Sequence, residues 1–158
     1  ITVTTLDDSI SRRLEPGAPL PKQRLFALNC LARSGVPTSV RIDPIIPGIN
    51  DEDIEDLVAA VCKAGARHIT SSTFKARPGS LRKIISVFPE ECAGLERMFE
   101  RGNRVAGSLY LPLEIREQMM ETVRKNANTA GLTFSSCREG FAPVYGINCD
   151  GSHLLFYD

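Results

Sequence analysis

The sequence contains no tryptophan and three tyrosines among its 158 residues. Proteins that bind single-stranded nucleic acid stack bases on aromatic side chains, so the composition gives such a partner no independent support. Nineteen basic and nineteen acidic residues cancel, and this balance does not favour binding to nucleic acid or to an anionic membrane. No apolar run approaches the ~20 residues that span a bilayer. The start, ITVTTLDD, lacks the pattern of a signal peptide.

Cysteines are present, but their spacings match no standard zinc pattern. Cys30 and Cys62 fall on apolar faces of predicted helices, where reduced thiols are common. We therefore expect a reducing, cytoplasmic compartment. Cys137, Cys149 and His153 have the residue types of a metal site but lack a clear fourth ligand. We predict no metal ligand among them and favour buried or substrate-facing thiols.

Hydrophobic periodicity divides the first half of the chain into alternating strands and helices. The predicted strands are residues 1–6, 38–44 and 66–72, and the predicted helices are residues 21–35 and 51–65. Short connections between such units force parallel strands with right-handed crossovers. The fold class is therefore α/β, either a doubly wound sheet or an arc of a (β/α) barrel.

The second half of the chain changes character. We predict a basic loop or short helix at residues 76–83, helices at 89–102 and 112–131, and a strand that starts at 132. A turn-rich tail follows and ends in a short apolar run. We predict one unit over residues 1–75 and an extension over 76–158. Parallel strands that begin at the first residue leave a sheet edge open, and open edges are a liability. We therefore expect the C-terminal part of something larger.

The stretch RIDPIIPGINDEDIEDL, residues 41–57, places a proline-locked corner between a strand and a helix. Pro44 and Pro47 have no N–H, so the strand ladder must stop there. Pro47 and Gly48 are predicted as the centre of a type II turn, and Asn50 as the helix N-cap. The corner follows the C-terminal end of a strand, where ligands bind in α/β proteins.

Residues 2–51 resemble the radical S-adenosylmethionine enzymes, and among them the spore photoproduct lyase-like group, often labelled DNA repair photolyase. The matching phrases are TVTTLD, LEPGAP, an arginine that opens the next helix, and PIIPGIND, followed later by FSSCREGF and CDGSHL. The resemblance implies an arc of a partial (β/α)6 TIM-like barrel, about strands 4 to 6, with a mixed helix and strand extension behind it.

The resemblance also implies S-adenosylmethionine and a four-iron four-sulfur cluster in the intact protein. In the family a Cys-x3-Cys-x2-Cys loop holds the cluster, and these residues contain no such loop. We expect this chain alone to retain neither cofactor and to be inactive without the N-terminal, cluster-bearing half of the same protein.

The resemblance assigns Thr2 and Thr4 to a strand whose hydroxyls contact the cofactor. It suggests that either Glu15 or Arg24 fixes the amino acid moiety, through a glutamate–ammonium pair or an arginine–carboxylate fork. The alternatives are that threonine simply favours strands and that the two charges form a solvated pair. A lone histidine such as His68 is more often structural than functional.

Arg41 lies between two apolar strand residues, so alternation points it into the barrel. A charge there is costly unless it is paired. The resemblance gives the corner the role of an apolar wall that packs on adenine, preformed and with little entropy to lose on binding. The corner residues assigned to this role are Ile46, Pro47, Gly48, Ile49 and Asn50.

The leading interpretation is the C-terminal part of a radical S-adenosylmethionine enzyme that abstracts hydrogen through a 5′-deoxyadenosyl radical. The substrate is not readable, and nucleic acid enters by family analogy alone. One alternative is a non-catalytic α/β binding module. Another is an aldolase-type barrel fragment, but the lysines fall in predicted helices or loops rather than at strand ends. A cysteine that donates a hydrogen atom to a radical is a further option.

Overall fold

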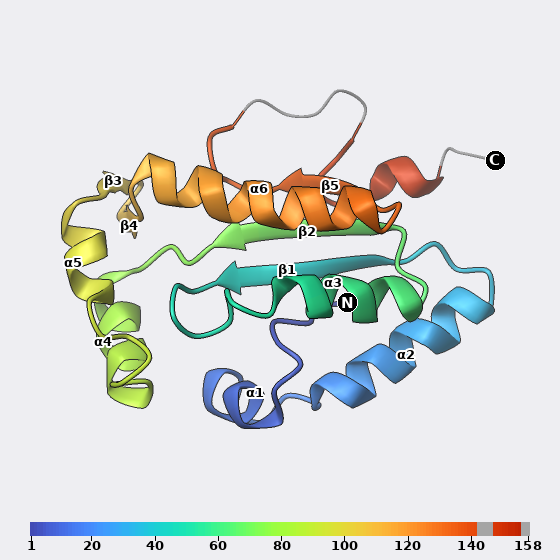
Figure 1. Cartoon of the computed structure of the whole chain (residues 1–158), viewed down its shortest axis with the longest axis horizontal. Helices are drawn as coiled ribbons and strands as arrows, with labels where there is room; N and C mark the ends of the chain where they lie inside the picture. The colour runs from blue at the N-terminus through green and yellow to red at the C-terminus, as the bar shows by residue number, and fades with distance from the viewer. Residues whose placement is uncertain (142–146, 156–158) are drawn as a thin grey trace.

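The computed structural model describes residues 1–141 and 147–155 (Figure 1). Its helices are α1 (Asp8–Leu14), α2 (Pro21–Arg33), α3 (Ile54–Lys63), α4 (Pro78–Val87), α5 (Leu95–Glu100), α6 (Leu113–Thr129) and the short 3-10 helix η1 (Ser152–Leu155). Its strands are β1 (Ser39–Ile45), β2 (His68–Thr73), β3 (Asn103–Val105), β4 (Ser108–Tyr110) and β5 (Thr133–Ser136). Part of the predicted turn-rich tail and the end of its apolar run lie outside the described residues. No described helix is long and apolar enough to cross a bilayer.

A three-stranded parallel sheet, in the order β1-β2-β5, lies at the centre of this mixed α/β fold. The N-terminal segment runs beside β1, where Thr2 forms a parallel bridge with Arg41 and the Val3 N–H donates to the Arg41 carbonyl at 2.9 Å. The prediction that the first three extended segments are parallel neighbours in chain order is confirmed. Three strands do not by themselves form a barrel, so the predicted partial barrel is not confirmed.

The first extended segment is shorter than predicted, because a helix that the periodicity did not indicate begins directly after it. Asp7 is the N-cap of α1, and its side chain accepts a hydrogen bond from the Ile10 N–H at 2.8 Å. The short helix α1 packs its partly buried Ile10 and Leu14 against a second core, described next. Such a helix of two turns gives too few positions for a periodic signal.

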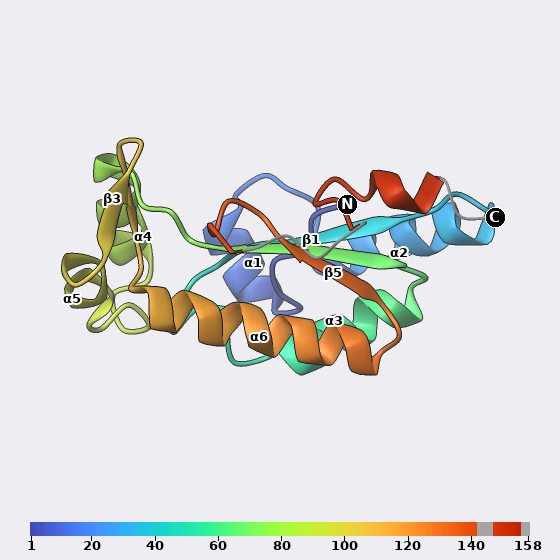
Figure 2. The same ribbon diagram turned by 90° about the horizontal axis from the view of Figure 1, so that it is seen from above.

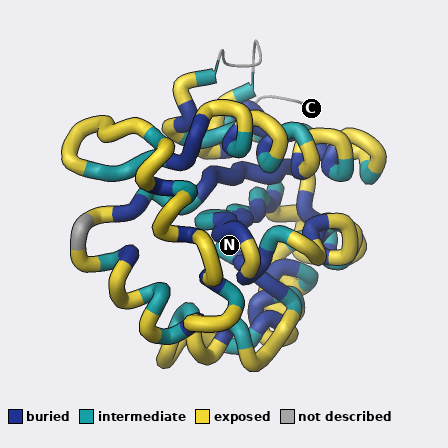
Figure 3. The backbone as a smooth tube through the Cα atoms, turned by 60° about the vertical axis from the view of Figure 1, so that its left-hand side comes forward, coloured by how far each residue is buried: buried dark blue, intermediate teal, exposed yellow. Residues whose placement is uncertain are grey.

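Two hydrophobic clusters hold the fold together. In the first, α2, α3 and α6 cover one face of the sheet; its central members include Leu28, Ile42, Val61, Ile69 and Val123. In the second, α4 and α5 pack on the corner after β1, beyond the C-terminal ends of the strands (Figures 1 and 2). The buried strands run between exposed loops (Figure 3). Segments on both sides of residue 75 contribute to both clusters, and the boundary suggested there stays a prediction.

Two details of the predicted helices are wrong. The N-cap of α3 is Asp53 rather than Asn50. The periodicity predicts one apolar stripe on α6, made of Ile115, Met119, Thr122, Val123 and Ala127. The structure buries Val123 and Ala127 but adds Arg116 and Met120, leaves Ile115 and Met119 partly buried, and exposes Thr122. Arg116 is buried because it meets a carboxylate, as described below, and helical periodicity of apolar residues cannot indicate an inward-facing arginine.

The second half contains one element that the sequence did not indicate. The hairpin β3–β4 lies between α5 and α6. Its two strands have three residues each, β3 exposed and β4 half-buried, and they carry no clear alternation. Residues 78–83 of the basic stretch lie in α4, and the helix predicted over 89–102 is confined to α5 after a series of turns.

The corner after β1 forms the predicted type II turn. The Ile49 N–H donates to the Ile46 carbonyl at 3.1 Å, and Gly48 takes φ +79° at the position that needs a left-handed residue. Asn50 closes the corner from inside: its Oδ1 accepts from the Ile46 N–H at 2.8 Å, and its Nδ2 donates to the Thr4 carbonyl at 2.8 Å. Asn50 is therefore an internal brace of the corner and ties it to the N-terminal segment.

Gly48→Ala is expected to destabilise the protein more than Gly17→Ala. Both glycines have positive φ, +79° and +86°, so both substitutions strain the backbone by about 1–3 kcal/mol. At Gly48 the new Cβ would also lie 2.3 Å from the Glu91 carbonyl oxygen, whereas at Gly17 it would meet nothing within 4 Å. Urea denaturation of the two variants measures the difference. Equal losses would mean that the Glu91 contact relaxes freely and that the corner is not tightly packed.

Candidate functional site

The face of the sheet opposite the helices is polar. Val40 and Ile42 of β1 are wholly buried in the first core, so Arg41 and Asp43 between and beyond them point to the other face. On that face one row of side chains crosses the whole sheet in register: Thr2 pairs with Arg41, Arg41 with Thr70, and Thr70 with Ser135. This polar row places the predicted Thr2 and Arg41 side by side.

Arg41 has the charge partner that an inward arginine needs. Its Nη2 lies 2.5 Å from Asp43 Oδ2, and Ser72 donates to the other carboxylate oxygen at 2.6 Å. Partial burial works against the charged form, but the hydrogen bonds to Asp43 and to the Cys137 thiol raise the pKa of Arg41 overall. The Arg41 side chain keeps 37% of its surface exposed. It is therefore held in place and still open to a ligand.

The predicted residues Thr4, Glu15 and Arg24 form one cluster. The Thr4 hydroxyl donates to Glu15 Oε2 at 2.7 Å, and Arg24 Nη1 lies 3.0 Å from the same oxygen. Arg24 also donates to the Pro19 carbonyl at 2.7 Å and to the Thr2 carbonyl at 3.1 Å. The pair is not fully solvated, because the Arg24 side chain is 9% exposed, while that of Glu15 keeps 27%.

One atom of this cluster is unsatisfied. Arg24 Nη2 is buried and has no hydrogen-bond partner among the described residues. An unpaired polar atom of a charged group carries a desolvation cost of about 1–3 kcal/mol or more. One donor of the guanidinium is therefore left without an acceptor from the described chain, and because the atom is buried, a ligand reaches it only when the surrounding side chains move.

The corner joins this cluster through Asn50, whose Nδ2 binds the Thr4 carbonyl. Its apolar side chains, however, face inward: Ile46, Pro47 and Ile49 are buried, and the two isoleucines belong to the second core. Gly48 is the exposed residue of the turn. Contact between the corner and adenine stays a prediction. Among these residues, Gly48 is the one exposed for such a contact.

The tail crosses the polar face near the N-terminal ends of the strands. The His153 ring lies edge-on to the His68 ring, with centroids 4.6 Å apart, and its Nε2 lies 3.1 Å from the Thr133 hydroxyl. The His68 ring is fully buried and contacts the hydroxyls of Thr133 at 2.8 Å and of Ser135 and Thr70 at 3.1 Å. The two histidines thus attach η1 to the sheet, which is the structural role expected for His68.

A buried ion network was missed by the sequence analysis. Glu139 is fully buried, and its Oε1 accepts from Lys75 at 2.6 Å, from the Thr73 N–H at 2.7 Å and from the Thr73 hydroxyl at 3.0 Å. Its Oε2 lies 3.1 Å from Arg116 Nη1. Lys75, Arg116 and Glu139 are far apart in sequence. Glu139 lies in the phrase FSSCREGF, but no sequence signal joins it to the two cations. The network binds the start of α6 to the C-terminal ends of β2 and β5.

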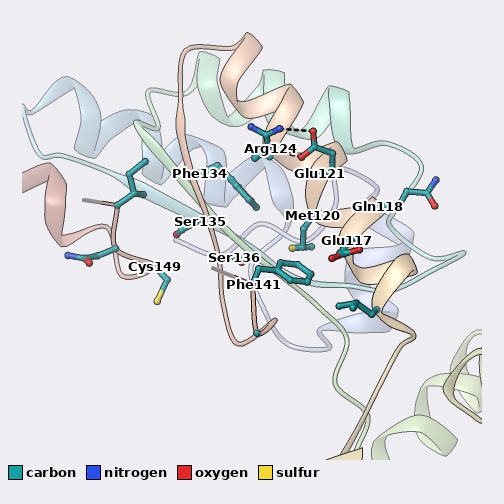
Figure 4. Close-up of a pocket in the computed structure, with 14 residues that line it drawn as sticks. Glu117, Gln118, Met120, Glu121, Arg124, Phe134, Ser135, Ser136, Phe141 and Cys149 are labelled. Carbon is teal, nitrogen blue, oxygen red and sulfur yellow. Dashed lines mark hydrogen bonds and ion pairs between the residues drawn. The ribbon is translucent and has the colours of Figure 1, made fainter. Parts of the chain in front are cut away.

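A groove of about 930 Å³ runs between α6, β5 and the tail (Figure 4). Its wall is mainly apolar, with Met120, Phe134 and Phe141, while Glu121 and Arg124 form a hydrogen-bonded pair at the rim. None of the predicted cofactor residues lines it. No three metal-ligating side chains converge anywhere in residues 1–141 and 147–155.

Comparisons with known proteins give distant relatives. The chain is 24% identical over 144 residues to the radical SAM Nalpha-GlyT isomerase of Pseudomonas phage M6, a match that covers 87% of this chain and 30% of that protein. It is 26% identical over 130 residues to uncharacterised proteins of Mycobacterium tuberculosis and Mycobacterium bovis, over 78% of this chain and 36% of theirs. The chain thus spans about a third of the length of these relatives.

No family model matches the sequence, and no solved structure matches it. The phage relative links the chain distantly to radical S-adenosylmethionine proteins. The narrower assignment to the spore photoproduct lyase-like group stays a proposal.

His68 should make stability depend on pH. Burial, followed by repulsion from His153, lowers the pKa of His68 from 6.5 to about 4. The neutral ring therefore stabilises the fold fully above about pH 6.5, and this contribution is lost at up to about 1.4 kcal/mol per pH unit as the pH falls toward 4. Denaturation free energies at about pH 7 and pH 5 measure the loss.

His68→Gln is the control for this prediction. The chain has two histidines, so the variant isolates the contribution of His68. Its stability should fall less between the two pH values than that of the parent. Parallel pH profiles for parent and variant would show that His68 titrates normally and is not held neutral by burial.

Proposed function

We propose that this chain is the C-terminal part of a radical S-adenosylmethionine enzyme of the spore photoproduct lyase-like group. Two observations support membership of the superfamily: the matching phrases occur in the family's order along the chain, and the phage relative is named a radical SAM isomerase. The share of the relatives that it spans is in keeping with a missing N-terminal half of the same protein, which is its expected partner. Its unpaired cysteines are in keeping with a cytoplasmic location.

The arrangement of the sheet supports an arc of a partial barrel. The N-terminal segment, β1 and β2 are parallel neighbours in chain order, and α2, α3 and α6 pack on one side of them. In a barrel of this kind the opposite face is the interior. That face carries the polar row, and the side chains of Arg41 and Asp43 point to it. The interior of such a barrel would therefore offer polar groups that can bind a ligand.

The unsatisfied Arg24 nitrogen is the observation that carries the cofactor proposal. The amino acid moiety of S-adenosylmethionine has a carboxylate, which a fixed guanidinium donor binds with charge-assisted hydrogen bonds. It also has an ammonium group, for which Glu15 is the acceptor 3.0 Å from Arg24. The residues present therefore fit this end of the cofactor. The chemistry that the bound cofactor supplies is hydrogen abstraction through a 5′-deoxyadenosyl radical.

The iron–sulfur cluster does not fit this chain. The cysteines contain no Cys-x3-Cys-x2-Cys arrangement, and the described residues gather no three ligands. The cluster is thus assigned to the N-terminal half, and the present residues are assigned to binding. Thr4 orients Glu15, Glu15 and Arg24 hold the amino acid moiety, and Arg41, positioned by Asp43 and Ser72, faces the substrate side.

Arg24→Lys in the intact, cluster-loaded enzyme is expected to weaken S-adenosylmethionine binding about 10-fold to 100-fold. A lysine keeps the charge but loses the fork that reaches Glu15 and the ligand together, at a cost of about 1.5–3 kcal/mol. Calorimetric titration measures the affinity, and circular dichroism checks folding.

Arg33→Lys is the matched control, because Arg33 is an exposed arginine in the last turn of the same helix. It should bind the cofactor like the parent. If Arg24→Lys is folded and also binds like the parent, Arg24 is a structural clamp and the cofactor assignment fails. An intact protein that takes up neither iron nor S-adenosylmethionine would instead favour the non-catalytic binding module.

A further inference from the structure

The polar face carries a pair of cysteines that the proposed function does not use. The Thr70 hydroxyl donates to the Cys149 carbonyl at 2.6 Å, and the Cys137 N–H donates to the Ser71 carbonyl at 2.8 Å. Consecutive residues of β2 therefore anchor both cysteines. Although they are twelve positions apart in the sequence, the sheet brings them together.

Both cysteines also lie beside the polar face and are accessible. Cys149 and Ser136, the residue before Cys137, line the same groove (Figure 4). The pKa of Cys149 is raised, first by partial burial and then by interaction with the Cys137 thiol. Cys149 is exposed and Cys137 is partly exposed, so reagents in solution can reach both.

The other cysteines lack these features. Cys30 is exposed on α2, on the far side of the first core from the polar face, and Cys92 is buried in the second core. Cys62 is partly buried, and its thiol lies 3.4 Å from the Ala130 carbonyl. The position of the pair, beside Arg41, is therefore distinctive.

We propose that Cys137 and Cys149 form a reversible dithiol–disulfide site that reacts with low-molecular-weight disulfides such as oxidised glutathione. One thiolate attacks a sulfur of glutathione disulfide, its S–S bond breaks, and one glutathione thiolate leaves and takes up a proton. The second cysteine then attacks the mixed disulfide and releases the second glutathione. The two thiols lose two electrons and two protons, and glutathione disulfide is reduced to two thiols.

Such a bond would fix the tail across the sheet. The segment that carries Cys149 already crosses β2 at Thr70, in the polar row next to Arg41. In the dithiol form that segment is held there by hydrogen bonds, and in the disulfide form by a covalent bond to the residue after β5. Oxidation would therefore change how freely the tail can leave the polar face. This inference does not depend on the proposed cofactor.

Thiol counting and peptide mapping test the site. After incubation of the folded 158-residue chain with glutathione disulfide, the thiols of Cys137 and Cys149 are both expected to be lost, and the exposed Cys30 is expected to carry at most a glutathione adduct. Mass spectrometry should find one cross-link, Cys137 to Cys149, which dithiothreitol reverses. Cys137→Ser and Cys149→Ser should each abolish the cross-link and leave a glutathione adduct on the remaining cysteine of the pair.

Cys30→Ser is the matched control, since it removes an exposed thiol away from the pair, and it should leave the cross-link unchanged. The same reaction in guanidinium should lose its selectivity, which shows that the folded sheet brings the cysteines together. The proposal is overturned if the folded chain forms no Cys137–Cys149 bond at any glutathione ratio, or if other pairs form as readily.

Discussion

The pairing of the buried Arg24 guanidinium organises the N-terminal half of the molecule. A charge that is nine-tenths removed from water must meet acceptors in fixed positions. Arg24 meets Glu15 and the carbonyls of Thr2 and Pro19, so α2 is tied to the segment on either side of α1. Thr2 is thereby held against β1. The corner is fixed in turn, because Asn50 binds the carbonyl of Thr4, which itself orients Glu15.

A second buried charge organises the other half. Glu139 follows β5 and meets Lys75 after β2 and Arg116 at the start of α6. Burying a carboxylate with two cations and two further donors satisfies its oxygens more fully than a single ion pair would. The network thus locks the C-terminal ends of two neighbouring strands to one helix. Removing one partner would leave an unpaired buried charge, which costs more than the pair gains.

The sequence predicted the features that depend on local rules. Periodicity, proline and glycine, or alternation predict the strands β1 and β2, the helices α2, α3 and α6, the type II turn, and the position of Arg41 on the face opposite the helices. The errors have non-local causes. Asn50 looks like an N-cap but braces the corner, because its partner Thr4 is forty-six residues away. Arg116 breaks the apolar stripe of α6 because Glu139 lies opposite it. The pairing of Glu15 with Arg24 was suggested through resemblance rather than spacing, and the contact of Thr4 with Glu15 was not predicted.

The polarity of the open face of the sheet bears on what kind of molecule this is. A sheet whose second face merely met water would need no fixed pairing across its strands. Here the polar row is instead bonded internally: Asp43 holds Arg41 and Ser72, His68 contacts three hydroxyls, and the tail binds Thr70. Fixed side chains lose little entropy when a ligand arrives. Their rotamers are set by neighbours rather than by solvent, which is how binding faces inside barrels are built. The described face therefore presents side chains that are already fixed in place, as a ligand-binding surface requires.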